Sequence, residues 1–179
     1  MKSTLGIPDK SIDEVTLLLN TLLADEYVLY TKTRNAHWNT SGPGFYELHK
    51  FFEIQYDVLN IMIDDIAKRV RSLGRFALGS LKDFLHVTRI GEDGPDFSQS
   101  SHVIQLLIND HETIIRMMRN DIIPIATKSK DFGTADLGTG LMEQHEKMTW
   151  MLRSFLTEPD FSATNHIRTI TAQLVDEKH

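Results

Sequence analysis

Long runs of apolar residues at helical spacing constrain the fold of this chain more than any other feature of its sequence. Between about Ser11 and Asn39, apolar side chains recur every three or four residues, and the alternation typical of strands is absent along the chain. Similar runs extend from Phe45 to about Leu73, from about Ser100 to Thr127 and from about Ala135 to Leu156. Four such segments predict an all-α four-helix bundle.

Capping residues, glycines and prolines mark the ends of these segments. Ser11 is a candidate N-cap for the first segment, which the Gly-Pro-Gly sequence within residues 40–44 ends. Gly74 is a candidate C-cap for the second segment. Pro124 has no amide hydrogen, so we expect it to kink or loosen the last turns of the third segment. Residues 128–136 predict a polar loop before the fourth segment.

The connection between the second and third segments, residues 75–99, is long and contains several glycines. Within it, residues 80–87 predict a short extra helix. A long connection favours an up-down-down-up bundle with a crossover over a simple up-and-down bundle. We therefore expect a single bundle over residues 11–156, with an N-terminal tail at residues 1–10 and a C-terminal tail at residues 157–179.

Composition and charge exclude several classes of protein. The 179 residues carry a formal net charge of −6, which argues against a polyanion-binding surface and suits cationic partners. The absence of cysteine excludes disulfides and thiolate metal sites. No apolar run reaches the roughly 18 residues that a membrane span needs, and the first residues lack the apolar centre of a signal peptide. A cytoplasmic location is the expectation.

Side chains that commonly bind metals gather at the end of the first segment and along the second. His37 precedes the Gly-Pro-Gly sequence, and His49 and Glu53 are four residues apart, on one helical face. Asp64 lies on the same face, three turns further on, and is followed four residues later by Lys68. Imidazole and carboxylate groups together are typical ligands of Fe²⁺, although they suit zinc and cobalt as well.

These candidate ligands are too far apart to form one site within one chain. At 1.5 Å per residue, His49 and Asp64 lie about 22 Å apart along the helix axis, whereas metal–ligand bonds are about 2 Å long. An antiparallel copy of the same helix would bring His49 and Glu53 of one chain to Asp64 of the other, and a two-fold axis would create two equivalent shared sites. Each acid taken singly is also a common solvated residue, and Asp64 with Lys68 is also explained as an ordinary i,i+4 ion pair.

The segment from His37 to His49 begins His-Trp-Asn and continues through Gly42-Pro43-Gly44-Phe45, and it resembles the Dps family of mini-ferritins, the DNA-binding proteins from starved cells. The resemblance extends across about residues 10–156 and implies a ferritin-like four-helix bundle with a short extra helix in the long connection. It also implies a dodecameric hollow shell that oxidises Fe²⁺, preferably with hydrogen peroxide, and stores the ferric product inside. The iron sites of the family lie at two-fold interfaces.

The resemblance assigns metal-binding and catalytic roles to four residues of this sequence: His37, His49, Glu53 and Asp64. Lys68 stands where the second acidic pair of the family ends in glutamate, which changes the local charge by two units. We therefore expect a weakened oxidase centre, in which Lys68 pairs either with Glu53 of the partner subunit or with Asp64. Trp38, beside His37, is a candidate electron donor that quenches radicals near the iron, and an interface anchor is an equally good interpretation.

Other acidic and histidine residues are expected to have surface roles. Those with ligand chemistry are His111, Glu112, Glu143, His145 and Glu146. They lack the paired Glu-x-x-His spacing that a di-iron site within one bundle requires. Asp121, Asp131 and Asp136 flank a loop that resembles the acidic entry-pore region of the family. An iron funnel is one interpretation of these acids, and ordinary solvation of a loop is the expected role.

Few cations are available for binding DNA at the two ends of the chain. The first eleven residues contain Lys2 and Lys10, and the last four are Asp-Glu-Lys-His, so counterion release predicts weak or no DNA binding at physiological salt. The leading hypothesis is thus an iron-oxidising and iron-storing cage that protects against oxidative damage. Two alternatives are a structural or DNA-protecting shell without efficient ferroxidase activity, in which Lys68 has abolished the oxidase step, and an unrelated helical bundle with surface acids.

Overall fold

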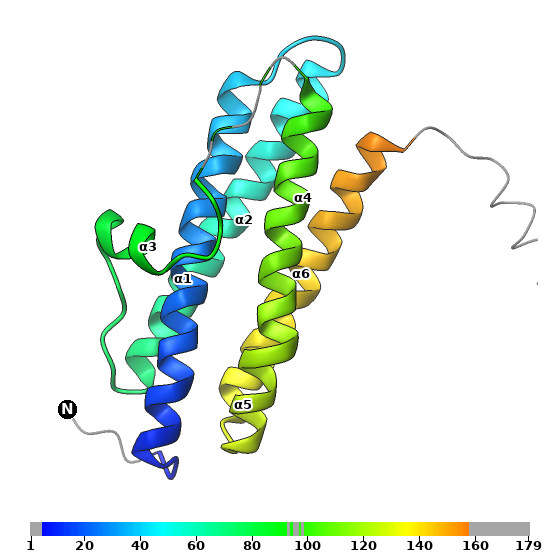
Figure 1. Cartoon of the computed structure of the whole chain (residues 1–179). Helices are drawn as coiled ribbons and strands as arrows, with labels where there is room; N and C mark the ends of the chain where they lie inside the picture. Colours follow the sequence, from blue (N-terminus) through cyan, green and yellow to red (C-terminus); the bar gives the residue numbers. More distant parts are fainter. Residues whose placement is uncertain (1–4, 93, 95–96, 98, 158–179) are drawn as a thin grey trace, which may run out of the picture.

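Four long helical segments form an elongated bundle in the computed structural model, which describes residues 5–92, 94, 97 and 99–157. All regular elements in this part of the chain are helices. The long helices are α1 (Asp9–Asn39), α2 (Phe45–Ser72), α4 (Ser100–Met117) and α6 (Phe132–Leu156). Helices α1 and α6 run in one direction and α2 and α4 in the other (Figure 1). The all-α prediction and its up-down-down-up order are therefore confirmed.

The long connection from α2 to α4 returns along the outside of the bundle and carries the short helix α3 (Leu81–Val87), which lies beside α1 (Figure 1). Gly74, with φ at 81°, follows the end of α2 as the predicted left-handed cap. The Ser80 hydroxyl caps α3 by accepting a hydrogen bond from the Asp83 amide at 3.1 Å. Phe84 is buried and stacks on Tyr27 with ring centroids 4.6 Å apart, so the predicted extra helix is packed against the bundle.

Two helices begin earlier than the sequence suggested. Helix α1 begins at Asp9 after Pro8, whose ring fixes φ near the helical value, and Ser11 lies inside the helix rather than capping it. Helix α6 begins at Phe132 rather than near residue 135, because the Asp131 side chain accepts a hydrogen bond from the Thr134 amide at 3.1 Å. The predicted polar loop over residues 128–136 is therefore wrong in extent, and residues 129–131 alone separate the two helices.

The third long segment changes its winding where Pro124 approaches. Helix α4 is followed by a π-helical turn, η1 (Met118–Ile122), and then by α5 (Ile123–Lys128), which has Pro124 in its first turn. Proline cannot donate to the carbonyl four residues earlier, and its ring crowds that carbonyl. The wider π turn removes this conflict, so the expected loosening takes the form of a π segment.

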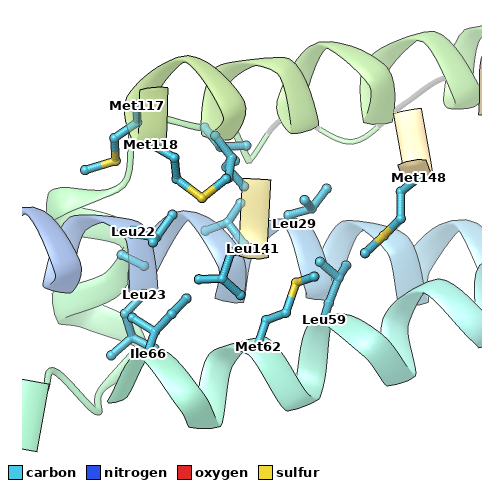
Figure 2. Packing of buried hydrophobic residues seen from close by; sticks show 14 of the residues in the cluster. Leu22, Leu23, Leu29, Leu59, Met62, Ile66, Met117, Met118, Leu141 and Met148 are labelled. Carbon is cyan, nitrogen blue, oxygen red and sulfur yellow. The ribbon is translucent and has the colours of Figure 1, made fainter. Parts of the chain in front are cut away.

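The core lies along the axis of the bundle. Figure 2 shows leucine and methionine side chains from different helices meeting there, among them Leu22, Leu59, Met62 and Met148. Burying each such side chain stabilises the fold by about 1.5–3 kcal/mol. No helix of the described residues is long and apolar enough to cross a membrane. The packed core fixes the ends of α1 and α2 relative to each other.

Candidate metal centre

His37 and His49 lie face to face where α1 meets α2. Their rings stack with centroids 3.8 Å apart and an interplanar angle of 20°. The Nδ1 atom of His37 lies 2.8 Å from the His49 carbonyl oxygen, and the Nδ1 atom of His49 lies 2.9 Å from the His37 carbonyl oxygen. A carbonyl oxygen can only accept, so each Nδ1 donates its hydrogen, an arrangement that in a neutral imidazole leaves the lone pair on Nε2. This is the tautomer in which a histidine binds a metal through Nε2.

The turn between the helices explains why these rings meet. Gly42 and Gly44 have φ values of 86° and 76°, in the left-handed region that costs other residues about 1–2 kcal/mol. The chain can therefore reverse within five residues, and α2 begins directly after Gly44. His37, near the end of α1, then faces His49 in the second turn of α2. The Phe45 ring stacks on the His49 ring, with the two ring centroids 5.2 Å apart.

Glu53 lies one turn beyond His49 and pairs with Lys50, whose Nζ atom is 2.7 Å from Oε2. The hydrogen bond and charge of Lys50, followed by smaller contributions from the two histidines, lower the pKa of Glu53. The carboxylate is therefore ionised at neutral pH, and a metal cation would compete with Lys50 for it. Lys50 was not among the predicted site residues, although its i,i+3 spacing to Glu53 is typical of an ion pair.

Asp64 and Lys68 form an ion pair on the exposed surface of α2, with 58% and 71% of their side chains accessible. The hydrogen bond and charge of Asp64 raise the pKa of Lys68, so the ammonium persists at neutral pH. The pairing that the sequence predicted for Lys68 is thus present within one protomer. Exposed pairs of this kind are screened by water and salt, so a competing cation can displace the ammonium from Asp64.

Within one protomer the four candidate ligands do not come together. Among the described residues, no group of three or more histidine, aspartate and glutamate side chains is arranged to hold a metal ion. His37, His49 and Glu53 are neighbours, whereas Asp64 lies about three turns further along α2. A ligand set that includes Asp64 therefore requires a second protomer.

Aromatic side chains surround Arg34 beside the histidine pair. The guanidinium carbon lies 5.0 Å from the centroid of Trp38, 5.6 Å from that of Tyr30 and 5.3 Å from that of Tyr56. Arg34 also donates from Nη1 to the Tyr30 hydroxyl at 2.8 Å. Trp38 is 63% exposed, whereas the Tyr56 ring is half-buried and meets His37 at 5.3 Å in an edge contact.

The expectation that His111 and His145 lie on the surface is wrong. Both are fully buried in the bundle, as is Glu26 of α1. The Nε2 atom of His145 lies 2.8 Å from Glu26 Oε1, and its Nδ1 atom lies 2.8 Å from His111 Nδ1, so the three residues link α1, α6 and α4. Burial, and then the charge of His145, place the pKa of His111 well below its usual value. The sequence held a signal for His111, which continues the apolar stripe of Ile104 and Leu107.

Glu26, His145 and His111 are hydrogen-bonded in a row, with His145 in the middle. Their side chains therefore do not converge on one point, as metal ligands must. The row is a polar contact within the core, and its outer atoms, Glu26 Oε2 and His111 Nε2, have no hydrogen-bond partner among the described residues. Buried polar atoms without partners are costly. Its effect is thus expected on stability rather than on the candidate metal centre.

Asp131 is buried at the start of α6 and is not a solvated loop residue. It accepts hydrogen bonds from Arg69 of α2 and from the amide and hydroxyl of Thr134, the latter at 2.6 Å. A Cβ atom at Gly133 would lie 3.0 Å from the Arg69 guanidinium, so a larger residue there would require the guanidinium to shift by a few tenths of an ångström. Asp131 therefore ties α2 to α6, and its carboxylate is committed to that contact.

Comparisons with known proteins fit this architecture. The ferritin-like domain family model matches residues 16–161, so the chain belongs to the ferritin-like proteins. An uncharacterised low temperature-induced protein of Nostoc sp. is 41% identical over 152 residues, which span 85% of each chain. DNA protection during starvation protein 2 of Bacillus anthracis is 33% identical over 146 residues, which cover 81% of this chain and 98% of the relative.

The solved structures agree with these relatives. The crystal structure of a Dps protein from Vibrio cholerae O1 superposes with a TM-score of 0.81 at 30% identity and covers 88% of this chain and 98% of the other. Within the ferritin-like proteins, the chain belongs to the Dps family. The family that the segment from His37 to His49 predicted is therefore confirmed.

Proposed function

We propose that this chain is a mini-ferritin that binds and oxidises Fe²⁺ at sites shared between two protomers and stores the ferric product inside a dodecameric cage. The histidine pair carries the proposal, because carbonyl hydrogen bonds leave both Nε2 atoms free beside the ionised Glu53. Family membership supports it, since the Vibrio cholerae Dps protein is described as a ferritin-like diiron-carboxylate protein. Peroxide as the oxidant and a cytoplasmic location belong to the same proposal.

Each site would combine His37, His49 and Glu53 with Asp64 of the partner subunit. Two neutral imidazoles and two carboxylates form a ligand set with a charge of −2, which balances one Fe²⁺. The same antiparallel pairing brings the Lys68 ammonium of the partner subunit to this site. A positive charge in place of a carboxylate opposes a second cation, so we propose one strong iron position per site rather than two.

The reaction consumes iron as a substrate. Hydrogen peroxide takes up two electrons, so the complete reduction by iron converts two Fe²⁺, one H₂O₂ and two protons into two Fe³⁺ and two molecules of water. Glu53 and Asp64 attract the ferrous ion, and the histidines hold it while the oxidant reacts. With one strong iron position, the two electrons do not leave from two irons held side by side.

The histidine pair provides the test of the proposed function. Ferrous oxidation by peroxide is followed by stopped-flow absorbance in the native protein and in the double variant His37→Ala, His49→Ala. The variant is expected to lose at least about tenfold in rate, on the scale that changes at metal sites typically produce. His102→Ala, an exposed histidine on α4, is the matched control and should retain the native rate. An unchanged rate in the double variant, with assembly intact by light scattering, contradicts the proposal.

Lys68 favours a second candidate, a structural or DNA-protecting shell without efficient ferroxidase activity. Its ammonium already occupies the Asp64 carboxylate in one protomer. We propose weak or absent DNA binding, because the net charge is −6. The prediction of weak DNA binding also used Lys2 and Lys178, and both lie outside the described residues. A compact complex in a gel-shift at about 150 mM salt would contradict the DNA proposal.

A further inference from the structure

A groove of about 360 Å³ lies between α2 and α6, on the side of the bundle away from α3. Its apolar lining comes from both helices and consists of Phe51, Ile54, Val58, Met148 and Met151. Two of these side chains, Ile54 and Met151, are 63% and 37% exposed. An apolar groove between two helices is the kind of surface on which the apolar face of a further helix packs. The described residues leave this groove uncovered.

The chain leaves the described structure beside one end of the groove. Helix α6 ends at Leu156, at the end of the bundle where α2 begins (Figure 1). In its last turn the Phe155 ring contacts the Phe51 ring, with the two centroids 5.1 Å apart. Phe51 lines the groove, and so does Met151, which precedes Leu156 by five residues. Residues 158–179, which lie outside the described residues, therefore start where the groove starts.

The sequence of this C-terminal segment contains one short amphipathic pattern. Ile167, Ile170 and Leu174 recur at the spacing i, i+3, i+7, which places them on one helical face. Asn165 precedes them and is a residue type that commonly caps a helix start. Ala172 falls on the opposite face. A helix of about ten residues is marginal by itself in water, so it depends on an apolar surface against which to pack.

The apolar face of the segment and the groove have the same length. Ile167 and Leu174 are seven residues apart, as are the two ends of the groove on α2, residues 51 and 58, and on α6, residues 144 and 151. At 1.5 Å per residue, each of these spans is about 10.5 Å long. The residues between Thr157 and Ile167 are enough to reverse the chain, because an extended chain covers about 3.3 Å per residue.

Charge favours one direction of the segment. Lys147 lines the part of the groove that is remote from the end of α6. Asp176 and Glu177 directly follow Leu174 in the sequence. A segment that runs antiparallel to α6 brings these two carboxylates toward the Lys147 ammonium, whereas the opposite direction brings them toward Phe51 and the apolar end.

We propose that residues 165–176 form a helix that packs in the groove between α2 and α6 of the same chain, antiparallel to α6. Ile167 then lies near Met151, and Leu174 lies near Val58. The exposed apolar lining of the groove is covered by the chain's own C-terminal segment rather than by a second copy. This docking does not depend on iron.

Disulfide cross-linking in the assembled, full-length protein tests this docking. The chain has no cysteine, so two introduced cysteines report on each other alone. Under mild oxidation, Val58→Cys with Leu174→Cys should form a disulfide within one chain, because that bond requires Cα atoms about 4.4–6.8 Å apart. The matched control is Val58→Cys with Ala172→Cys, which places the second thiol on the opposite face and should form little disulfide. Non-reducing electrophoresis and mass spectrometry separate a bond within one chain from a bond between two chains.

A second measurement leaves the groove residue Val58 unchanged. Met151→Cys alone should react slowly with a maleimide in the full-length chain, because the docked segment covers it. Adding Ile170→Asp should speed the reaction, whereas adding Thr169→Asp, the same change in charge on the outer face, should not. Light scattering checks that all variants assemble alike.

Three results would overturn the proposal. The first is a disulfide yield for Val58→Cys with Leu174→Cys no higher than that of the Ala172→Cys control. The second is a disulfide that joins two chains, which would assign the groove to the segment of a second copy. The third is an equal maleimide rate for Met151→Cys with and without Ile170→Asp, which would show that the segment does not cover the groove.

Discussion

At the scale of single residues, the histidine pair depends on two backbone carbonyls. Each carbonyl holds the hydrogen on Nδ1 of the opposite ring, so the two Nε2 lone pairs are available without any rearrangement of the side chains. Lys68 has the opposite effect, because its ammonium neutralises the Asp64 carboxylate. The carbonyl contacts orient the histidine ligands, and Lys68 changes the local charge. Each of these two effects on the candidate metal centre can be tested by substitution.

Lys68→Glu is expected to raise the rate of ferrous oxidation. The change replaces an ammonium by a carboxylate, frees Asp64 and adds a ligand for a second cation, so we expect a gain of about tenfold, a scale typical of metal-site changes. Stopped-flow absorbance with peroxide measures the rate. Lys147→Glu, an exposed lysine on α6, makes the same change in net charge and should leave the rate unaltered. Equal rates for the native protein and Lys68→Glu would show that Lys68 does not slow ferrous oxidation.

At the scale of helices, the sequence predicted the long elements well, because apolar periodicity alone determines which faces are buried. It placed the starts of α1 and α6 too late, since Pro8 and Asp131 act as caps where Ser11 and a loop were expected. A surface position was expected for His111 and His145 because they lack the paired Glu-x-x-His spacing of a di-iron site. Their hydrogen bonds to each other and to Glu26 are tertiary contacts. Hydrogen bonds between side chains of three different helices are not reflected in the spacing of residues along the sequence.

The buried His111 predicts a stability that falls in acid. Its pKa in the folded chain lies well below the value of 6.5 that applies when it is exposed. The unfolded chain therefore binds a proton below pH 6.5 that the folded chain does not, and stability declines by up to about 1.4 kcal/mol per pH unit as the pH falls below that value. Denaturant unfolding in His111→Gln should show a flatter dependence between pH 6.5 and 5. His102→Gln, an exposed histidine on the same helix, should keep the native slope, and a native slope in His111→Gln would contradict the assignment.

The start of α6 predicts opposite effects for two glycines. Alanine at Gly133 would place its Cβ 3.0 Å from the Arg69 guanidinium and disturb the contact with buried Asp131, so we expect a loss of about 1–3 kcal/mol. Gly140 lies in the same helix with open space around it, so Gly140→Ala should be neutral or stabilise by about 0.5–1 kcal/mol. Thermal unfolding measures both. A Gly133→Ala protein as stable as Gly140→Ala would show that Arg69 moves away without cost.

At the scale of the whole molecule, the protomer exposes a number of large apolar side chains. They occur on several helices and in the connection after α2, and include Leu17, Tyr46, Ile54, Ile61, Phe76, Phe132 and Trp150. Exposed apolar surface on a soluble bundle is typical of interfaces between protomers. The sequence predicted a shared site from the spacing of His49 and Asp64 along one helix, whereas the geometry of the interface itself depends on a second chain.

The size of the assembly follows from the proposal of a dodecameric cage. Light scattering at neutral pH is expected to give a mass twelve times that of the 20.5 kDa chain. Ile61→Asp introduces a charge on the exposed face of α2, where the two-fold pairing would bury it, and should shift the population toward smaller species. Tyr46→Ser, which removes an exposed apolar ring without adding charge, is the control and should affect assembly less. A native protein that remains a monomer contradicts the shared site.

Anomalous diffraction at the iron edge, from crystals of the assembled protein soaked anaerobically in Fe²⁺, tests whether two protomers share the iron site. We expect one strong iron peak at each half of the two-fold interface, about 2 Å from Nε2 of His37 and of His49. Carboxylate oxygens of Glu53 and of the partner subunit's Asp64 should complete the site. Iron absent from the histidine pair, or bound there by residues of a single chain with Asp64 of the partner subunit uninvolved, would contradict it.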